Sequence, residues 1–153
     1  MPSFRTHRRV THSPVQMFNL VADVERYPEF LPLCEALRVR RRSAAEDGTE
    51  VLVAEMSVGY KAIRETFSSR VTLDRPRLGI TAEDLDGPFK HLENRWTFRE
   101  AEGGGCAVEF FITYEFKSFA LGLLMGGMFD RAFRRFTHAF EERANLIYGR
   151  QLA

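Results

Sequence analysis

Hydrophobic and polar residues repeat along the chain with two different periods, and the change of period separates its elements. From Phe119 to Tyr148 apolar residues recur every three or four positions, which predicts one long amphipathic helix. Ser118 can cap its start, and Gly149 can end it with a positive φ. The predicted apolar stripe consists of Leu121, Met125, Met128, Phe129, Ala132, Phe133, Phe136, Phe140, Ala144 and Ile147.

The middle of the chain alternates with a period of two, which is typical of strands with one buried face. In the clearest case, 62–73, the odd-numbered positions are mostly apolar and the even-numbered positions are polar. Further strands are predicted over 4–10, 35–42, 49–58, 78–82, 91–99 and 107–117. Short turns join them, among them Asp47-Gly48, a tight connection at Gly59-Tyr60, and Asp86-Gly87-Pro88.

A short helix is predicted after the first strand, because Ser13-Pro14-Val15-Gln16 has the pattern of a capping box. It should run from Pro14 to about Arg26 and stop before Pro28, because the residue preceding a proline avoids the helical region. The next segment, 27–34, is too stiff for a helix and too apolar for a solvated loop. We expect a short helical turn there, with side chains that insert into the rest of the protein.

The order of these elements limits the fold. None of the predicted connections is long enough for a crossover between parallel strands, so the sheet must be antiparallel. One face of the sheet and one face of the last helix are apolar, and each can cover the other. The predicted fold class is therefore α+β, with a curved antiparallel sheet wrapped around a long C-terminal helix. A length of 153 residues suits a single domain over 1–153.

Composition narrows the possible partners. The net charge is +1, so no bulk field draws the chain to DNA or to anionic lipid. The 14 phenylalanines suit a thick core or the wall of an apolar cavity.

Cys34 and Cys106 form neither a disulfide framework nor a metal-ligand spacing. The N-terminal residues lack the apolar run of a secretory signal, and no stretch reaches the ~20 apolar residues of a membrane span, so we expect a cytoplasmic protein.

Several stretches carry a resemblance to a known family. They are Tyr27-Pro28-x-Phe30-Leu31-Pro32-x-Cys34, the segment from Ile63 to Val71, Asp86-Gly87-Pro88-Phe89 leading to Leu92-x-x-x-Trp96-x-Phe98, and the phenylalanine-rich last helix. In this order they resemble the coenzyme Q-binding protein and ribosome-association toxin family. That family belongs to the START-like, helix-grip proteins and is related to polyketide cyclases. The resemblance spans nearly the whole chain.

The resemblance implies an internal tunnel between the sheet and the last helix that holds a hydrophobic ligand. Relatives in the coenzyme Q branch bind ubiquinone and support respiratory electron transfer without catalysing a reaction. Bacterial relatives block the association of ribosomal subunits, and the resemblance does not choose between these roles. In the first role the chain needs no obligatory cofactor and no metal. It would carry ubiquinone or a similar lipid and could touch the inner face of the membrane transiently.

The candidate ligand contacts are residues on the inward faces of these elements. The apolar candidates are Phe30, Leu31, Phe67, Val71, Trp96, Phe98, Phe110, Ile112, Met125, Met128, Phe129, Phe133 and Phe136. Each buried CH₂ contributes about 0.8 kcal/mol, so a few isoprene units suffice for tight binding. The same residues would also make an ordinary core. Glu65, Asn94 and Tyr114 place polar groups on the inward faces, and each can contact either a quinone carbonyl or a neighbouring protein group.

An enzyme related to the cyclases is an alternative, and it would need an acid or base inside the tunnel. Only Glu65 and Tyr114 qualify among the residues predicted to face inward. No nucleophile elbow, zinc-binding helix motif or phosphate-binding glycine loop occurs in the sequence. We therefore expect no catalytic residue and no metal ligand. The histidines are scattered and expected to be exposed: His7, His12, His91 and His138.

A ribosome-binding role would need a local basic patch, because phosphate contacts depend on clustered positive charge. The last helix offers Arg131, Arg135 and His138 on one face, with Arg134 beside it, and a second cluster comprises Arg38, Arg40, Arg41 and Arg42. Interleaved acidic residues also allow a simple solvated surface, and the same arginines could rest on anionic membrane lipid.

The last helix itself divides into two parts. The segment 121–127 is apolar nearly all round and contains Gly122, Gly126 and Gly127. Each glycine costs a helix up to ~1 kcal/mol. We expect this first part to be the mobile end, a lid or membrane-touching gate, and the part from about Met128 onward to be a fixed wall.

Overall fold

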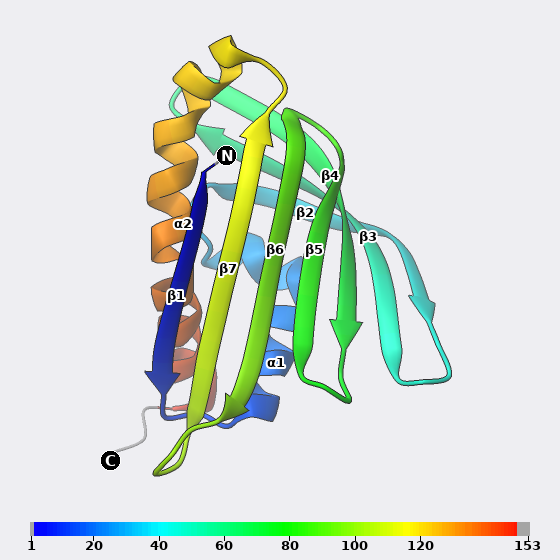
Figure 1. Cartoon of the computed structure of the whole chain (residues 1–153), viewed down its shortest axis with the longest axis vertical. Helices are drawn as coiled ribbons and strands as arrows, with labels where there is room; N and C mark the ends of the chain where they lie inside the picture. The colour runs from blue at the N-terminus through cyan, green and yellow to red at the C-terminus, as the bar shows by residue number, and fades with distance from the viewer. Residues whose placement is uncertain (1, 150–153) are drawn as a thin grey trace.

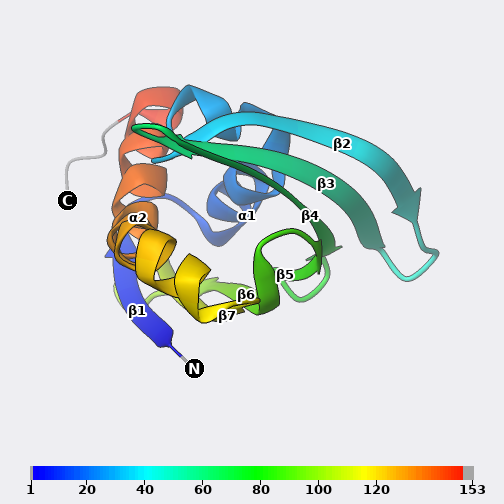
Figure 2. The same cartoon turned by 90° about the horizontal axis from the view of Figure 1, so that it is seen from above.

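The computed structural model of the protein describes residues 2–149. Seven strands form one curved antiparallel sheet, and helix α2 (Phe119–Tyr148) lies along its concave side (Figure 1). Seen from above, the sheet curls around the space that it shares with the helices (Figure 2). The other elements are β1 (Ser3–Val10), α1 (Pro14–Ala22), the 3₁₀ helix η1 (Val24–Glu29), β2 (Cys34–Ala44), β3 (Thr49–Tyr60), β4 (Ile63–Asp74), β5 (Gly79–Asp86), β6 (Phe89–Glu100) and β7 (Cys106–Phe116).

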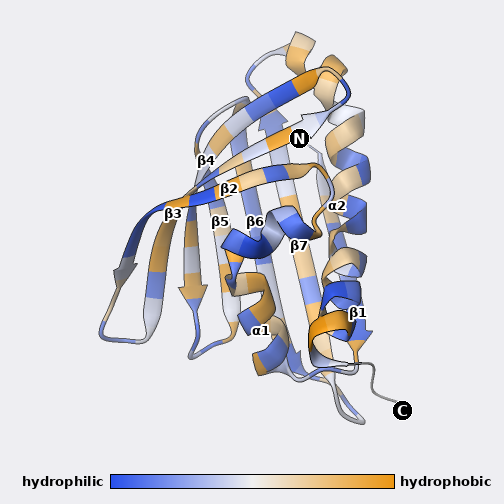
Figure 3. Cartoon of the chain, turned by 180° about the vertical axis from the view of Figure 1, so that it is seen from behind, coloured by the Kyte–Doolittle hydropathy of each residue, from blue (hydrophilic) through white to orange (hydrophobic). Residues whose placement is uncertain are grey.

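The strand order is β1-β7-β6-β5-β4-β3-β2, and every neighbouring pair is antiparallel. From β2 to β7 each strand pairs with the next one along the chain, whereas β1 pairs with β7. Hydrophobic and hydrophilic residues alternate along the strands (Figure 3), which leaves one apolar face toward α2. The register of β2 shifts between Cys34 and Ala36 and again between Val39 and Arg41. The α+β helix-grip fold expected from the sequence is confirmed.

Helix α2 begins and ends at the predicted residues. The Ser118 hydroxyl accepts a hydrogen bond from the Leu121 backbone N–H at 3.1 Å, as a cap should. Its buried side chains are Met125, Met128, Phe129, Ala132, Phe133, Thr137, Phe140 and Ala144. Ile147, predicted to face inward, is 51% exposed. Tyr148 turns inward instead, and its hydroxyl donates to the Gln16 carbonyl at 3.2 Å.

The capping box at the start of α1 is present. The Gln16 N–H donates to the Ser13 hydroxyl at 3.1 Å, and the Ser13 N–H donates to the Gln16 side chain at 2.9 Å. The predicted end at Arg26 is wrong, because α1 stops at Ala22 and η1 follows. Pro28 lies inside η1, where a proline without an N–H is accommodated by the tighter turn. None of the helices within residues 2–149 is both long and apolar enough to cross a membrane.

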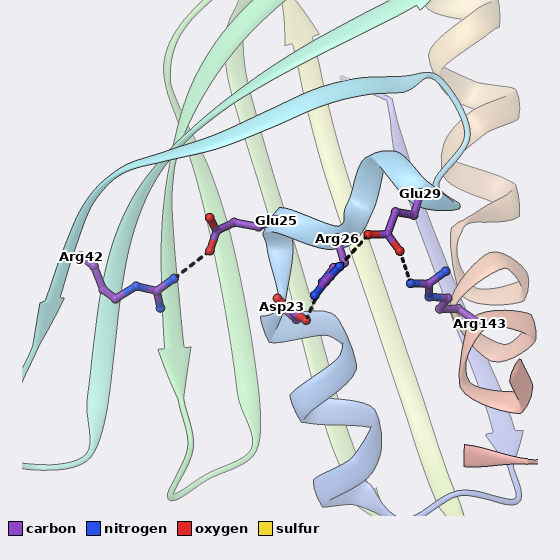
Figure 4. Close-up of polar contacts among 6 residues, drawn as sticks. All are labelled: Asp23, Glu25, Arg26, Glu29, Arg42 and Arg143. Atoms are coloured by element: carbon purple, nitrogen blue, oxygen red, sulfur yellow. Dashed lines mark hydrogen bonds and ion pairs between the residues drawn. The ribbon is translucent and has the colours of Figure 1, made fainter. Parts of the chain in front are cut away.

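Ion pairs connect η1 to α2 on one side and to β2 on the other (Figure 4). Glu29 pairs with Arg143 of α2 and with Arg26, the latter at 3.0 Å. At the other end of η1, Glu25 pairs with Arg42 of β2 at 3.6 Å. Both arginine hydrogen bonds lower the pKa of the Glu29 carboxyl. Arg143 belongs to the polar side of the periodic pattern of α2, but its side chain is only 16% exposed.

Two other local predictions are wrong. The Gly59-Tyr60 pair belongs to β3, and the turn falls two residues later at Lys61 and Ala62, with Lys61 at φ 55. His12, expected to be exposed, is fully buried, and its Nε2 lies 2.7 Å from Oδ1 of Asn145. His12 lies just before α1, and the local sequence does not indicate that α2 covers it.

Phe111 interrupts the polar outer face of β7, and the alternation of the strand does not explain it. The guanidinium groups of Arg5 and Arg95 lie over its ring, at 4.7 Å and 4.8 Å from the centroid. These arginines come from the flanking strands β1 and β6, so the outward ring is covered by cation–π contacts.

The two parts of α2 should differ in stability. Its first turns expose large apolar side chains and contain glycines, as in Phe119 at 83% and Leu123 at 73% exposure. We expect amide hydrogen exchange to be faster over 119–127 than over 128–148. Gly122→Ala should slow exchange in the first part, because its added methyl group meets only Phe116 at 3.8 Å and alanine favours helix by about 1 kcal/mol. Uniform protection along the whole wild-type helix would contradict this division.

Candidate ligand-binding cavity

An internal cavity lies between α2, η1 and the concave face of the sheet. It offers about 100 Å³ to the centres of water-sized molecules. A single water needs only about 10–15 Å³ by the same measure, so the space exceeds a packing defect. A long-chain ligand would nevertheless have to widen it. Residues from every strand between β2 and β7 contribute to its wall.

Part of the predicted ligand set lines this cavity. The predicted residues in its wall are Leu31, Phe67, Val71, Asn94, Trp96, Ile112, Phe129, Phe133 and Phe136. They come from the segment after η1, from β4, β6 and β7, and from α2. Trp96 is the only tryptophan of the chain, and it packs edge-on against Phe140 with 5.0 Å between centroids. Whether these residues contact a ligand stays a prediction.

The other predicted residues lie outside the cavity wall: Phe30, Glu65, Phe98, Phe110, Tyr114 and Met125, with Met128 in an adjoining hollow. Most of them face inward as expected but are covered by neighbours. Phe98 packs against Phe18 of α1, at 6.1 Å between centroids. Tyr114 packs against Phe133 at 5.2 Å, and burial raises the pKa of its hydroxyl. Glu65 is half-buried near the start of β4.

The sequence reasoning missed a second group of wall residues. They are Val24, Tyr27, Pro32, Leu33, Leu37, Ala54, Met56, Val58, Ser69, Ile80, Ala82, Leu92, Ala132 and Phe140. The alternation of β3 carried a usable signal, because Ala54, Met56 and Val58 occupy successive inward positions. The apolar segment after η1 carried another, since it was expected to insert into the protein.

The polar groups in the wall are few and mostly engaged within the protein. The Asn94 side-chain amide donates to the Phe111 carbonyl at 2.9 Å and accepts from the Trp96 indole N–H at 3.0 Å. The Tyr27 hydroxyl donates to the Val21 carbonyl, and burial raises its pKa. Ser69 adds one hydroxyl. Within residues 2–149, no carboxylate, imidazole, amine or thiol lines the cavity, so its chemistry suits an apolar guest.

A second hollow of about 230 Å³ adjoins the cavity, and we call it the outer hollow. It is lined by Pro32, Leu33, Tyr60, Met128, Arg131, Ala132 and Arg135. Pro32, Leu33 and Ala132 line both spaces, so these residues form the partition between them. The outer hollow differs from the cavity in having charged side chains in its wall.

The potential metal ligands and the two cysteines of residues 2–149 were compared with what a metal site or a reactive thiol requires. No group of three potential metal ligands gathers among residues 2–149. Cys34 and Cys106 are free, buried thiols, as the sequence indicated, and burial raises the pKa of each to about 11. Both are therefore protonated near neutral pH and poor nucleophiles.

Comparison with known proteins places the chain in a family. The sequence profile described as "Polyketide cyclase / dehydrase and lipid transport" matches residues 10–141. The chain belongs to this family. It is 37% identical over 140 residues to the ribosome association toxin RatA of Vibrio cholerae, covering 92% of this chain and 93% of that one. It is 34% identical to the mitochondrial coenzyme Q-binding protein COQ10 homolog B of Xenopus laevis, covering 89% and 55% respectively.

Solved structures of other proteins share the fold. The 18 kDa protein CC1736 from Caulobacter crescentus matches with a TM-score of 0.78 at 34% identity, over 97% of this chain and 99% of that one. Zhui aromatase/cyclase from Streptomyces sp. R1128 matches with a TM-score of 0.75 over 98% and 99%. Its identity of 17% supports the fold alone. The family resemblance seen in the sequence is thus confirmed.

Filling the cavity should be tolerated better than filling the packed core. Ala54→Leu adds carbon atoms to the wall at a residue that is 4% exposed, and we expect the free energy of unfolding to change by less than about 1 kcal/mol. Ala144→Leu is the matched control, because Ala144 is fully buried in α2 away from the cavity, and overpacking there should cost about 1–3 kcal/mol. Equal losses in urea denaturation would mean that the cavity is not open in solution.

Proposed function

We propose that the protein binds ubiquinone or a similar isoprenoid in the internal cavity. The observation that carries this proposal is the almost wholly apolar wall of the cavity between α2 and the sheet. Each CH₂ of a tail buried there contributes about 0.8 kcal/mol, so affinity grows with tail length and needs few polar contacts. The similarity to a coenzyme Q-binding protein favours a quinone among the possible tailed ligands.

We propose further that binding is not followed by catalysis. Glu65 and Tyr114, the candidate acid and base, lie outside the cavity wall. The amide of Asn94 is held by Trp96 and by the Phe111 carbonyl, which leaves it little freedom to act on a ligand. A cyclase- or dehydratase-like enzyme is the alternative, since such enzymes share the family and the fold. It predicts that Glu65→Gln removes turnover and leaves ligand affinity intact.

Ligand exchange would take place at a membrane surface. Phe119, Leu123 and Leu124 project large exposed apolar side chains from the first turns of α2. The chain contains three lysines, and all lie at this end of the sheet: Lys61 in the β3–β4 turn, Lys90 at the start of β6 and Lys117 just before α2. Exposed apolar side chains with lysines at the same end of the sheet suit the surface of an anionic bilayer, and two of these lysines, Lys90 and Lys117, also lie 4.0 Å from Glu115 and Asp86. The proposed location is therefore the cytoplasm, with transient contact at the inner face of the membrane.

Ribosome association is the second candidate function. The relatives named RatA cover nearly the whole chain, at 37% identity in Vibrio cholerae. On the outer face of α2, Arg131 and Arg135 are exposed and could contact RNA phosphates. The third predicted member of that patch, His138, has its Nδ1 3.3 Å from Arg8, so it is partly occupied.

Quinone binding should be visible through Trp96, which lies in the cavity wall. We expect a short-tailed ubiquinone to quench its fluorescence saturably, and Ala54→Leu to weaken binding about tenfold by occupying the space. Ala144→Leu should bind normally. Organic extraction of the purified protein followed by mass spectrometry should recover a quinone or related lipid. Absence of both an extracted lipid and any quenching would rule the proposal out.

Ribosome association makes a separate prediction. Purified protein added to ribosomal subunits should lower the joined fraction in a sucrose gradient, and Arg131→Gln with Arg135→Gln should restore it. Arg134→Gln is the control, because Arg134 is already paired with Asp130 at 3.0 Å. Unchanged subunit joining with the wild-type protein would exclude this function.

A further inference from the structure

We propose that the outer hollow is a headgroup site for an anionic amphiphile, with the ligand's tail passing between Leu33 and Ala132 into the internal cavity. This inference rests on the proposed function of the cavity and adds the chemical class of the ligand's polar end. The outer hollow would add amphiphiles that end in a phosphate or a carboxylate to the tailed ligands that the cavity can hold. The outer hollow adjoins the cavity that would hold the tail, and its arginines carry the positive charge that an anionic headgroup needs.

The position follows from the shared partition. Pro32, Leu33 and Ala132 each line both the cavity and the outer hollow, so the two spaces adjoin at these residues. A tail seated against Trp96 and Phe133 would leave its polar end on the outer side of this partition. The cavity wall, with no charged side chain among residues 2–149, would accept only the tail.

The charge comes from Arg131 and Arg135, one turn apart on α2. Within residues 2–149 neither guanidinium is ion-paired with a carboxylate, whereas Arg134 between them pairs with Asp130 at 3.0 Å. Like charges four residues apart on a helix repel each other, and an anion placed between them relieves that repulsion. Guanidinium groups bind phosphate and carboxylate through paired N–H donors, which makes this arrangement selective for such anions.

Residues at the rim of the outer hollow also favour binding of an anionic headgroup. Tyr60, at the end of β3, contributes a phenol that is 38% exposed. The ammonium group of Lys61 lies 5.3 Å from the centroid of its ring, which brings a third cation toward the mouth. An amphiphile fits these observations better than an RNA strand does, because the charged hollow adjoins an apolar cavity rather than a flat basic surface.

The partition contains an unusual backbone conformation. Leu33 has φ 69, in the left-handed region that a branched side chain rarely adopts. Its carbonyl accepts a hydrogen bond from the Gly59 N–H at 3.0 Å, which ties it to the end of β3. Strained residues of this kind persist where the surroundings impose them, often at ligand-binding sites. The backbone of Leu33 thus supports a ligand site where the two spaces adjoin.

The test compares two ligands with the same tail, dodecyl phosphate and dodecanol, by isothermal titration calorimetry with the full chain. Wild type should bind dodecyl phosphate about tenfold more tightly than dodecanol, and added salt should reduce the difference. Arg131→Gln with Arg135→Gln should bring dodecyl phosphate down to the affinity of dodecanol and leave dodecanol unchanged. Arg134→Gln should behave as wild type, and thermal unfolding should confirm that each variant is folded.

Each other outcome is decisive. If dodecanol binds but the phosphate gives no arginine-dependent advantage, the headgroup site is wrong and the cavity function stands. If neither ligand binds, the proposed cavity function fails and the headgroup site fails with it. Displacement of dodecyl phosphate by an equal concentration of inorganic phosphate would assign the outer hollow to the free anion. If the double variant loses only binding to ribosomal subunits, the arginines serve RNA and the inference is overturned.

Discussion

The contact between the apolar stripe of α2 and the concave face of the sheet is the constraint on which the rest of the structure depends. Seven strands spaced about 4.8 Å apart span about 29 Å, whereas a helix with its side chains is about 10 Å wide. One helix cannot cover such a sheet. Helix α2 packs mainly near β1 and β7, and α1 and η1 cover part of the remainder. The internal cavity is the portion of the apolar face that no element fills.

The family membership and the fold do not decide the function, because one fold carries several activities in the relatives. The proposed roles draw on different faces of α2. Phe129, Phe133 and Phe136 belong to the inner face, which would contact a tail. Arg131 and Arg135 belong to the outer face, which would contact an anion. A substitution can therefore be chosen that alters only one of these surfaces.

Much of the fold could be predicted from the sequence, because its elements have strong local signals. The bounds of α2 followed from the periodicity and the Ser118 cap, and the strands followed from their alternation. The cavity wall was predicted only in part. Periodicity identifies an inward face, but it does not tell which inward residues a neighbour will cover. Phe98 and Phe110 face inward as predicted and are covered by Phe18 and Phe4, whose positions depend on the tertiary fold.

An open sheet keeps two unpaired edges, and its edge strands can recruit further chains into a growing sheet. Strand β2 is one of these edges, and it carries two shifts of register together with Arg38, Arg40, Arg41 and Arg42. Bulges distort the row of free backbone groups, and clustered positive charge repels an identical edge. Arg40 and Arg42 are also held along the strand surface by Glu55 and Glu50. The bulged and charged edge is thus a poor template for pairing with an identical strand, whichever molecule the protein binds.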